Sequence, residues 1–180
     1  MNEFFDWTLE IIREEGSSMS WLEERRAEWT PAASVAIGQI IEGKTIIIVT
    51  DSERKWFEYY ILSNINKETM DRPIVPIAAL DAFYPHLEKA SSEEKLAMIE
   101  DMLSLAYSDN YFFWYIGKGN DSRAELAKRS GKNFLWIMDE EMQNSFLLHS
   151  YDKQLDVQLL HLFKLFNVSL SGVIFGEVDL

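Results

Sequence analysis

The stretch YFFWYIGKGNDSRAELAKRSGKNFLWIMD, residues Tyr111–Asp139, decides the fold class. It opens with a wholly apolar run, Tyr111–Ile116, whose length suits a strand buried on both faces. A polar loop, Gly117–Ser122, is followed by a short helical pattern, Arg123–Arg129. Gly131 then stands where a helix C-cap glycine is expected.

A second apolar run, Phe134–Met138, closes this unit and predicts a second strand. Strand, polar loop, helix and strand form a βαβ unit, in which the two strands are parallel and the crossover is right-handed. In such sheets the functional surface lies at the carboxyl ends of the strands. The loop Gly117–Ser122 occupies that place, so its chemistry bears directly on function.

The N-terminal quarter of the chain predicts three helices. The first spans Asn2–Glu15, and the second, rich in Glu and Arg, spans Trp21–Trp29. Thr30 is expected as the N-cap of the third helix and Pro31 as its first residue, which suits a proline without an amide hydrogen. The third helix is expected to end at Gly43.

The remaining pattern alternates strands with helices. Strands are expected at Lys44–Thr50 (KTIIIVT), Ile74–Leu80 and Phe146–His149, and helices at Glu53–Asn64, Ser92–Tyr107 and Leu155–Ser171. Four or five strands in this alternation predict an open, mostly parallel α/β sheet with helices on both faces. We expect a single domain over residues 1–180, with N-terminal helices at about 2–42, a sheet core at about 44–150 and a C-terminal helix and tail at 153–180.

Composition and charge restrict the functional classes. The chain of 180 residues has a formal net charge of −13, which disfavours direct nucleic-acid binding because such binding relies on Lys and Arg neutralising phosphates. It has no cysteine, so disulfides and thiolate chemistry are excluded. The acidic N-terminal stretch is unlike a signal peptide and no apolar run reaches the length of a membrane span, so we expect a soluble cytoplasmic protein.

Few residues are arranged for catalysis or ligand binding. Amides of the loop Gly117–Ser122 could bind an anion, but two glycines and a capping residue also suit any tight turn, and Asp121 would repel phosphate. The loop after the first strand, Thr50–Lys55, has no glycine, and its acids lie where a phosphate would sit. The three histidines, at positions 86, 149 and 161, are dispersed, and His161 is expected to be a buried core residue. We therefore expect no metal, no cofactor and no catalysis.

Aromatic and apolar residues offer a better functional lead. Trp21 and Trp29 flank a charged helix, and an apolar segment, Val173–Phe175, follows a helix that already carries an apolar stripe. Apolar groups beyond what one core needs often mark a protein interface. The alternative is ordinary packing in the core or between subunits.

Several motifs resemble the sugar isomerase (SIS) family, in the branch that contains phosphoheptose isomerases and the DnaA-binding protein DiaA. The segment Asp71–Leu80 (DRPIVPIAAL) is similar to the R-P-x-x-P-x-x-A-L pattern of that branch. Gly119–Arg123 resembles a G-N-S-R loop interrupted by Asp121, and Val157–His161 resembles the I-Q-E-x-H helix of catalytic members. The resemblance spans about residues 31–175 and implies a three-layer SIS-like, Rossmann-like fold.

Departures from the SIS pattern argue against an enzyme. Leu159 stands at the position of the catalytic glutamate, although Gln158 and His161 remain. The glycine- and serine-rich phosphate loop of the family is replaced by Asp51–Lys55. The alternative hypothesis is a sugar-phosphate isomerase or sugar-phosphate-binding regulator that uses Ser122, Gln158 and His161.

As a whole, length, aromatic content and acidity resemble the HobA family, SIS-like initiator-associating proteins of epsilon-class bacteria. That resemblance implies a homotetramer, built from dimers, that binds the N-terminal region of the replication initiator DnaA and promotes its assembly at the chromosomal origin. In DiaA-like members the partner surface includes an apolar pair near the C-terminus, and the resemblance implies that this pair is by position Ile174 and Phe175. Trp21 and Trp29 join them as candidates because we expect both to be exposed.

Overall fold

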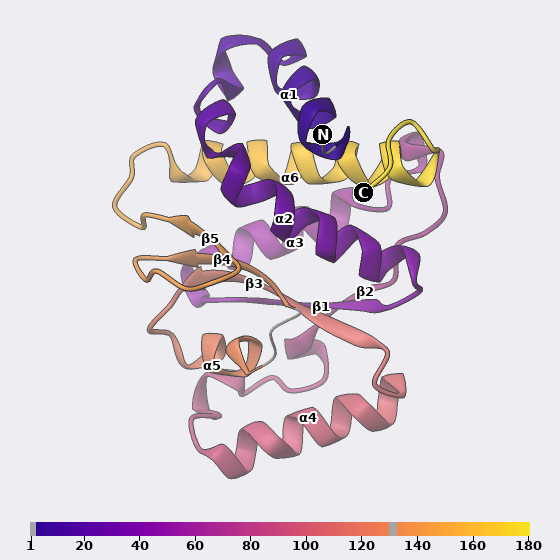
Figure 1. Cartoon of the computed structure of the whole chain (residues 1–180). Coiled ribbons are helices and arrows are strands. Elements are labelled where there is room, and N and C mark those ends of the chain that lie inside the picture. The colour runs from indigo at the N-terminus through magenta and orange to yellow at the C-terminus, as the bar shows by residue number, and fades with distance from the viewer. Residues whose placement is uncertain (1–2, 130–132) are drawn as a thin grey trace.

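The computed structural model describes residues 3–129 and 133–180, and it has an α/β fold (Figure 1). Gly131, the expected C-cap, lies outside the described residues. Five strands form one sheet in the order β2-β1-β3-β4-β5, and every neighbouring pair is parallel. Their bounds are β1 Thr45–Thr50, β2 Ile77–Ala79, β3 Tyr111–Lys118, β4 Phe134–Met138 and β5 Ser145–Leu148. The prediction of a mostly parallel α/β sheet is confirmed.

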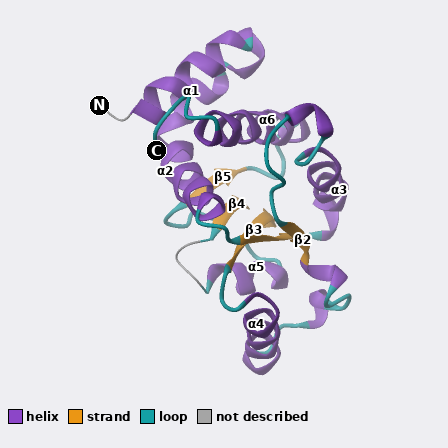
Figure 2. Cartoon of the chain, turned by 90° about the vertical axis from the view of Figure 1, so that its right-hand side faces the viewer, coloured by secondary structure: helices purple, strands orange, loops and turns teal. Residues whose placement is uncertain are grey.

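Helices cover both faces of the sheet, which gives three layers (Figures 1 and 2). One face carries α1 Glu3–Glu14, α2 Trp21–Ile41, α3 Lys55–Asn64 and α6 Leu155–Ile174, and the other carries α4 Glu93–Tyr107 and α5 Ser122–Lys128. Alternate residues of β1 serve the two layers: Ile46 and Ile48 pack with the first set of helices, and Ile47 and Val49 with the second. The apolar runs have no polar side because each strand is buried on both faces.

The prediction of a helix boundary at Thr30–Pro31 is wrong, because α2 runs unbroken from Trp21 to Ile41 with Pro31 inside it. Pro31 has no amide hydrogen to donate to the carbonyl of Ala27, and the preceding Thr30 hydroxyl donates to the carbonyl of Arg26 at 2.8 Å. Trp29 and Ile37, before and after the proline, are both fully buried in the same core. Packing along this face outweighs the cost of an interior proline, about 3 kcal/mol.

Helix α6 is the central helix of the larger core. By length and composition alone it could cross a membrane, but half of its apolar window is buried inside the protein. Its core side chains include Leu159, Phe163 and Phe166, and the last two contact the ring of Trp114 on β3. This is the composition that a core helix of a globular protein also shows.

The connection between β4 and β5 has no crossover helix. Only residues 139–144 join these parallel strands, where a dozen or more residues are usual. Asp139 and Asn144 have positive φ angles, 62° and 60°, a region that Asn and Asp tolerate better than most residues. Turns at these two residues bring the chain back so that β5 runs parallel to β4.

Candidate functional site

The crevice at the carboxyl ends of β1 and β3 is where an open parallel sheet would bind a ligand. The chain leaves β1 toward α3 on one face of the sheet and leaves β3 toward α5 on the other (Figure 1). Such a reversal opens a crevice between the two strands. The predicted loops after β1 and after β3 therefore meet here.

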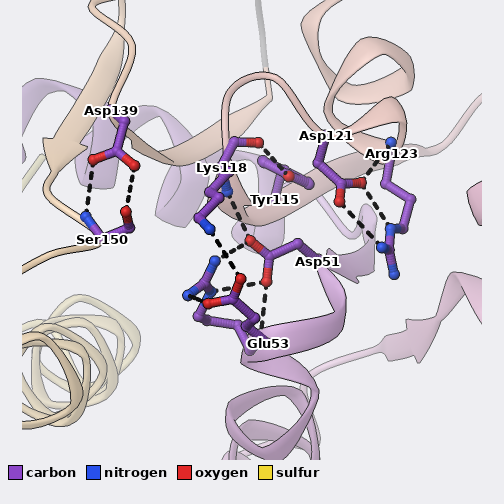
Figure 3. Close-up of polar contacts among 9 residues, drawn as sticks. Asp51, Glu53, Tyr115, Lys118, Asp121, Arg123, Asp139 and Ser150 are labelled. Carbon is purple, nitrogen blue, oxygen red and sulfur yellow. Dashed lines mark hydrogen bonds and ion pairs between the residues drawn. The ribbon is translucent and has the colours of Figure 1, made fainter.

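Asp51, directly after β1, fills the centre of this crevice (Figure 3). Its carboxylate accepts from the amide of Arg54 at 3.0 Å, from Arg54 Nε at 2.8 Å and from the amide of Lys118 at 2.8 Å. Arg54 Nη2 also donates to Oδ2. Asp51 is 3% exposed and Arg54 is 4% exposed, so this is a buried ion pair.

Gly117 is required by the position of this carboxylate. A Cβ at residue 117 would lie 2.8 Å from the Asp51 Cγ and 2.7 Å from the hydroxyl oxygen of Tyr115, closer than packed atoms allow. The predicted loop begins later than expected, because β3 continues through Gly117 to Lys118. The strand thus passes directly against the Asp51 carboxylate and donates the Lys118 amide to it.

Glu53 closes the solvent side of the crevice. It accepts from Arg54 Nη1 and from Lys118 Nζ, both at 2.9 Å, and so joins the loop after β1 to the end of β3. The hydrogen bond to Lys118, followed by the charge of Arg54, lowers the pKa of Glu53. Burial acts to lower the pKa of Arg54, but its bonds to Asp51 outweigh burial and the pKa is raised.

Asp121 caps the helix that follows β3. It accepts from the Arg123 amide at 3.0 Å and from Arg123 Nε at 2.8 Å. Beside it, the Tyr115 hydroxyl donates to the carbonyl of Lys118 at 2.8 Å. Burial, reinforced by the charges of Asp121 and Asp51, raises the pKa of Tyr115, so this phenol stays protonated.

These side chains, which we name the Asp51 cluster, have no net charge. The three acids are matched by three bases: Asp51, Glu53 and Asp121 with Arg54, Lys118 and Arg123. The amides that open α5 and the turn before α3 donate to the chain's own carboxylates. A phosphate that used the amides of Arg54 and Lys118 would have to displace Asp51, which argues against the anion-binding role considered for the loop Gly117–Ser122.

Residues of the isomerase hypothesis contact three different parts of the fold. The Ser122 hydroxyl donates to the carbonyl of Glu88 at 3.2 Å, and Gln158 Nε2 donates to Asp152 at 3.0 Å. His161 Nδ1 accepts from the indole nitrogen of Trp21 at 3.2 Å. Leu159 is fully buried in the core. Within residues 3–129 and 133–180, no group of three or more His, Cys, Asp or Glu could hold a metal ion.

Comparison with known proteins identifies the family. The whole chain, residues 1–180, matches the family described as "HobA: DNA replication regulator". It is 34% identical over 188 residues to the DNA replication regulator protein HobA of Helicobacter pylori (strain ATCC 700392 / 26695), with both proteins fully covered. The chain belongs to the HobA family.

Solved HobA structures share the fold described above. A crystal structure of HobA from H. pylori matches with a TM-score of 0.76 and 34% identity, covering 100% of this chain and 99% of that one. A crystal structure of a HobA–DnaA (domain I–II) complex from H. pylori matches with a TM-score of 0.76 and 29% identity, covering all of both chains. The HobA family assignment rests on sequence and structure together.

The partner-binding residues considered for this HobA-family chain differ in accessibility. The expectation that Trp29 is exposed is wrong: it is 0% exposed, because α2 passes unbroken through residue 29 and turns this side chain into the core. Trp21 is half-buried against the core and donates a hydrogen bond to His161. The expectation that His161 is a buried core residue is wrong, because it is half-buried. Ile174 is half-buried, and Phe175 is 52% exposed.

A groove lies between α3 and α6. It has a volume of about 720 Å³ and we name it the α3–α6 groove. An edge-to-face contact between Tyr60 and Phe163, with ring centroids 5.7 Å apart, joins its two walls. The residues that line it include Tyr60, Asn64, Lys67, Met70, Leu160, His161, Lys164, Asn167, Val168, Ser171, Phe175 and Glu177. Phe175 thus belongs to this groove, whereas Ile174 lines a separate apolar hollow with Ile41 and Ile74.

The sequence predicted part of the Asp51 cluster. It showed that acids replace the phosphate loop after β1, but not that Asp51 reaches the amide of Lys118, 67 positions away. An Asp followed three residues later by Arg, together with a glycine at the end of an apolar strand, is the signal that could have indicated this contact. The α3–α6 groove carries no motif, since its walls are about 100 residues apart in sequence.

Proposed function

We propose that this chain is a non-enzymatic adaptor that binds the N-terminal region of the replication initiator DnaA and promotes its assembly at the chromosomal origin. The observation that carries this proposal is the match, over the full length of both chains, to HobA in a crystal structure with DnaA domain I–II. Membership of a family of DNA replication regulators supports the same function.

The Asp51 cluster supports a non-enzymatic role. The position at which a parallel α/β sheet would bind a phosphorylated substrate holds a buried carboxylate with its full set of donors. Ser122, Gln158 and His161 each bond to a different element, so they do not form a common site. Function is therefore to be sought on the outer surface.

The adaptor proposal includes a homotetramer in the cytoplasm. Several initiator molecules held on one oligomer would have a raised effective concentration, which favours their assembly on DNA without any new contact between them. The net charge of −13 fits a protein that acts on DNA through a partner rather than directly. The candidate contact residues are Phe175, Ile174 and Trp21. Trp29 is no longer a candidate, because it is buried.

Substitution Phe175→Ala tests the contact surface. Truncation of an exposed aromatic anchor should weaken binding of the purified initiator N-terminal region by about tenfold in a calorimetric titration. Leu105→Ala is the matched control, because Leu105 is 86% exposed and lies on α4, on the opposite face of the sheet. Light scattering should give both variants the oligomeric mass of the wild type. Unchanged affinity in Phe175→Ala would remove that residue from the surface.

A sugar-phosphate isomerase or sensor is the alternative function. A thermal-shift screen with sugar phosphates separates it from the adaptor, because any ligand that binds only the folded state raises the melting temperature. We expect no shift with the wild-type chain, since Asp51 occupies the anion position. Clear stabilisation by a sugar phosphate would contradict the adaptor-only function.

A further inference from the structure

The α3–α6 groove has the dimensions of a helix-binding site. Its α6 wall extends from His161 to Phe175, about 20 Å at the helical rise of 1.5 Å per residue. A partner helix of about fourteen residues would lie along this length. Its apolar side chains would meet Tyr60 and Phe175, which are 40% and 52% exposed. Helices that bind in grooves use apolar anchors spaced in this way.

The charge of the groove differs from that of the whole molecule. Acids outnumber bases by 30 to 17 in the chain, and nine of the described bases form ion pairs with carboxylates. The groove lining contains one acid, Glu177, and two lysines. Lys67 is exposed there, and among the described residues no carboxylate lies within 4.0 Å of its ammonium group. Lys164 faces the same groove and pairs with Glu15 of the segment after α1.

Arg72 adds a further positive charge behind the groove wall. Its guanidinium donates to the carbonyl of Asn167 at 2.8 Å, to Ser171 Oγ at 2.7 Å and to the carbonyl of Ile65 at 2.8 Å. It also donates to Asn167 Oδ1. All four acceptors are uncharged, so within the described chain no acid neutralises this half-buried cation. Its field therefore acts on whatever lies in the groove.

Burial is the main cause of the pKa shifts at this groove. Burial lowers the pKa of Arg72, and no carboxylate opposes that effect. Burial, followed by the charge of Lys164, lowers the pKa of His161 despite the opposing charge of Glu15.

We propose that the α3–α6 groove binds an acidic amphipathic helix of the protein partner, with its apolar face against Tyr60 and Phe175 and its carboxylates against Lys67. This inference rests on the proposed adaptor function. The chain as a whole carries a charge of −13, whereas at this groove the bases Lys67, Lys164 and Arg72 outnumber the acids Glu177 and Glu15, which favours an acidic segment there. A basic helix would instead find carboxylates over most of the surface and would gain little selectivity here.

Reversal of one charge tests the groove. Lys67→Glu should weaken binding of the purified initiator N-terminal region by about tenfold, as expected for loss of a charge-assisted hydrogen bond. Lys153→Glu is the matched control: Lys153 is exposed, lacks an ion pair among the described residues and lies beside Ser150 and Asp156, outside the groove. Lys67→Gln provides a milder second variant, with a loss smaller than that of Lys67→Glu. Circular dichroism should show the wild-type fold for all three.

The outcomes distinguish failure of the groove as a binding site from failure of the adaptor function. If the wild type binds the initiator region and Lys67→Glu binds equally well, this inference is overturned while the adaptor function stands. If Lys67→Glu alters the oligomeric mass and not the affinity, the groove is an interface between copies and the inference is again overturned. If the wild type does not bind the initiator region at all, the proposed function itself fails.

Discussion

The Asp51 cluster and the α3–α6 groove are both lined by charged and aromatic residues, yet they differ in whether their charges are matched. At the carboxyl ends of β1 and β3, three acids and three bases neutralise one another, and Asp51 and Arg54 are almost fully buried. At the groove, Lys67 in the lining and Arg72 behind the wall have no carboxylate partner among the described residues. Complete pairing leaves nothing for a ligand, whereas unmatched charge is available to a partner.

This difference separates fold from function in the HobA-family chain. A parallel α/β sheet places a crevice at its strand ends whether or not a ligand is used. Here Asp51 supplies the negative charge that a bound phosphate would otherwise bring, and so the crevice contributes to stability. Surface grooves such as that between α3 and α6 can then carry the interaction.

Removal of the central carboxylate should have the largest effect. Asp51→Ala leaves the buried Arg54 with only the exposed Glu53 as a partner, and loss of one member of a buried ion pair typically costs about 3–5 kcal/mol. Urea denaturation at neutral pH measures the change in the free energy of unfolding. Glu53→Ala is the control, because its side chain is 59% exposed and its ion pairs are screened by water. A loss below about 1 kcal/mol for Asp51→Ala would show that the cluster does not stabilise the fold in this way.

Removal of the solitary guanidinium should have a smaller effect. Arg72→Met takes donors from the carbonyls of Ile65 and Asn167, and buried acceptors left without a donor cost about 1–3 kcal/mol. Lys67→Met serves as a control, since an exposed side chain without a partner should change stability by less than about 0.5 kcal/mol. The same denaturation assay applies. A loss as large as that of Asp51→Ala would erase the energetic distinction between cluster and groove.

The Asp51→Ala variant should also acquire a site for a small carboxylate. The amides of Arg54 and Lys118 and the Arg54 guanidinium would remain, now facing a space of about the size of a carboxyl group. Formate at ten times its dissociation constant would then add about 1.4 kcal/mol of stability. Thermal unfolding in sodium formate against sodium chloride measures this difference. Equal responses of variant and wild type would mean that the donors rearrange once Asp51 is removed.

Most of the fold could be predicted from the sequence, because a strand buried on both faces appears as a local run of apolar residues. The runs Tyr111–Ile116 and Phe134–Met138 are apolar throughout, and that pattern suits few structures other than a buried parallel strand. The boundary at Pro31 was misplaced because tertiary packing of Trp29 and Ile37 decides it, and local propensity favours a break. The wrong expectation that Trp29 is exposed has the same cause.

The candidate site was harder to predict from the sequence, because it depends on contacts between residues that are far apart in the chain. Acids after β1 indicated that no phosphate binds there, but only the sheet order brings Asp51 to the amide of Lys118. The groove depends on two helices that meet only after folding, so no spacing in the sequence predicts that Lys67 and Phe175 line the same groove. Taken singly in the sequence, a lysine and a phenylalanine give no indication that they line one groove.

The smallest predicted effect concerns pH and the end of the groove at His161. Burial and the charge of Lys164 hold the pKa of His161 below its usual value, so the folded state favours the neutral ring. Stability from this group is therefore complete above about pH 6.5, the ordinary histidine value, and falls as the pH drops from there through the folded pKa. Protonation would also place a proton on Nδ1, which accepts from the Trp21 indole.

The variant His161→Gln should remove this part of the pH dependence, because a glutamine oxygen can still accept a bond from Trp21 and does not titrate. Urea denaturation at pH 7.5 and at pH 5.5 should show a wild-type loss that exceeds the variant's by less than about 1 kcal/mol, since His161 is partly solvated. The Asp51 cluster contains no histidine, so Glu53→Ala should keep the wild-type slope over this range. Identical slopes for wild type and His161→Gln would mean that the Trp21–His161 contact does not couple protonation to folding.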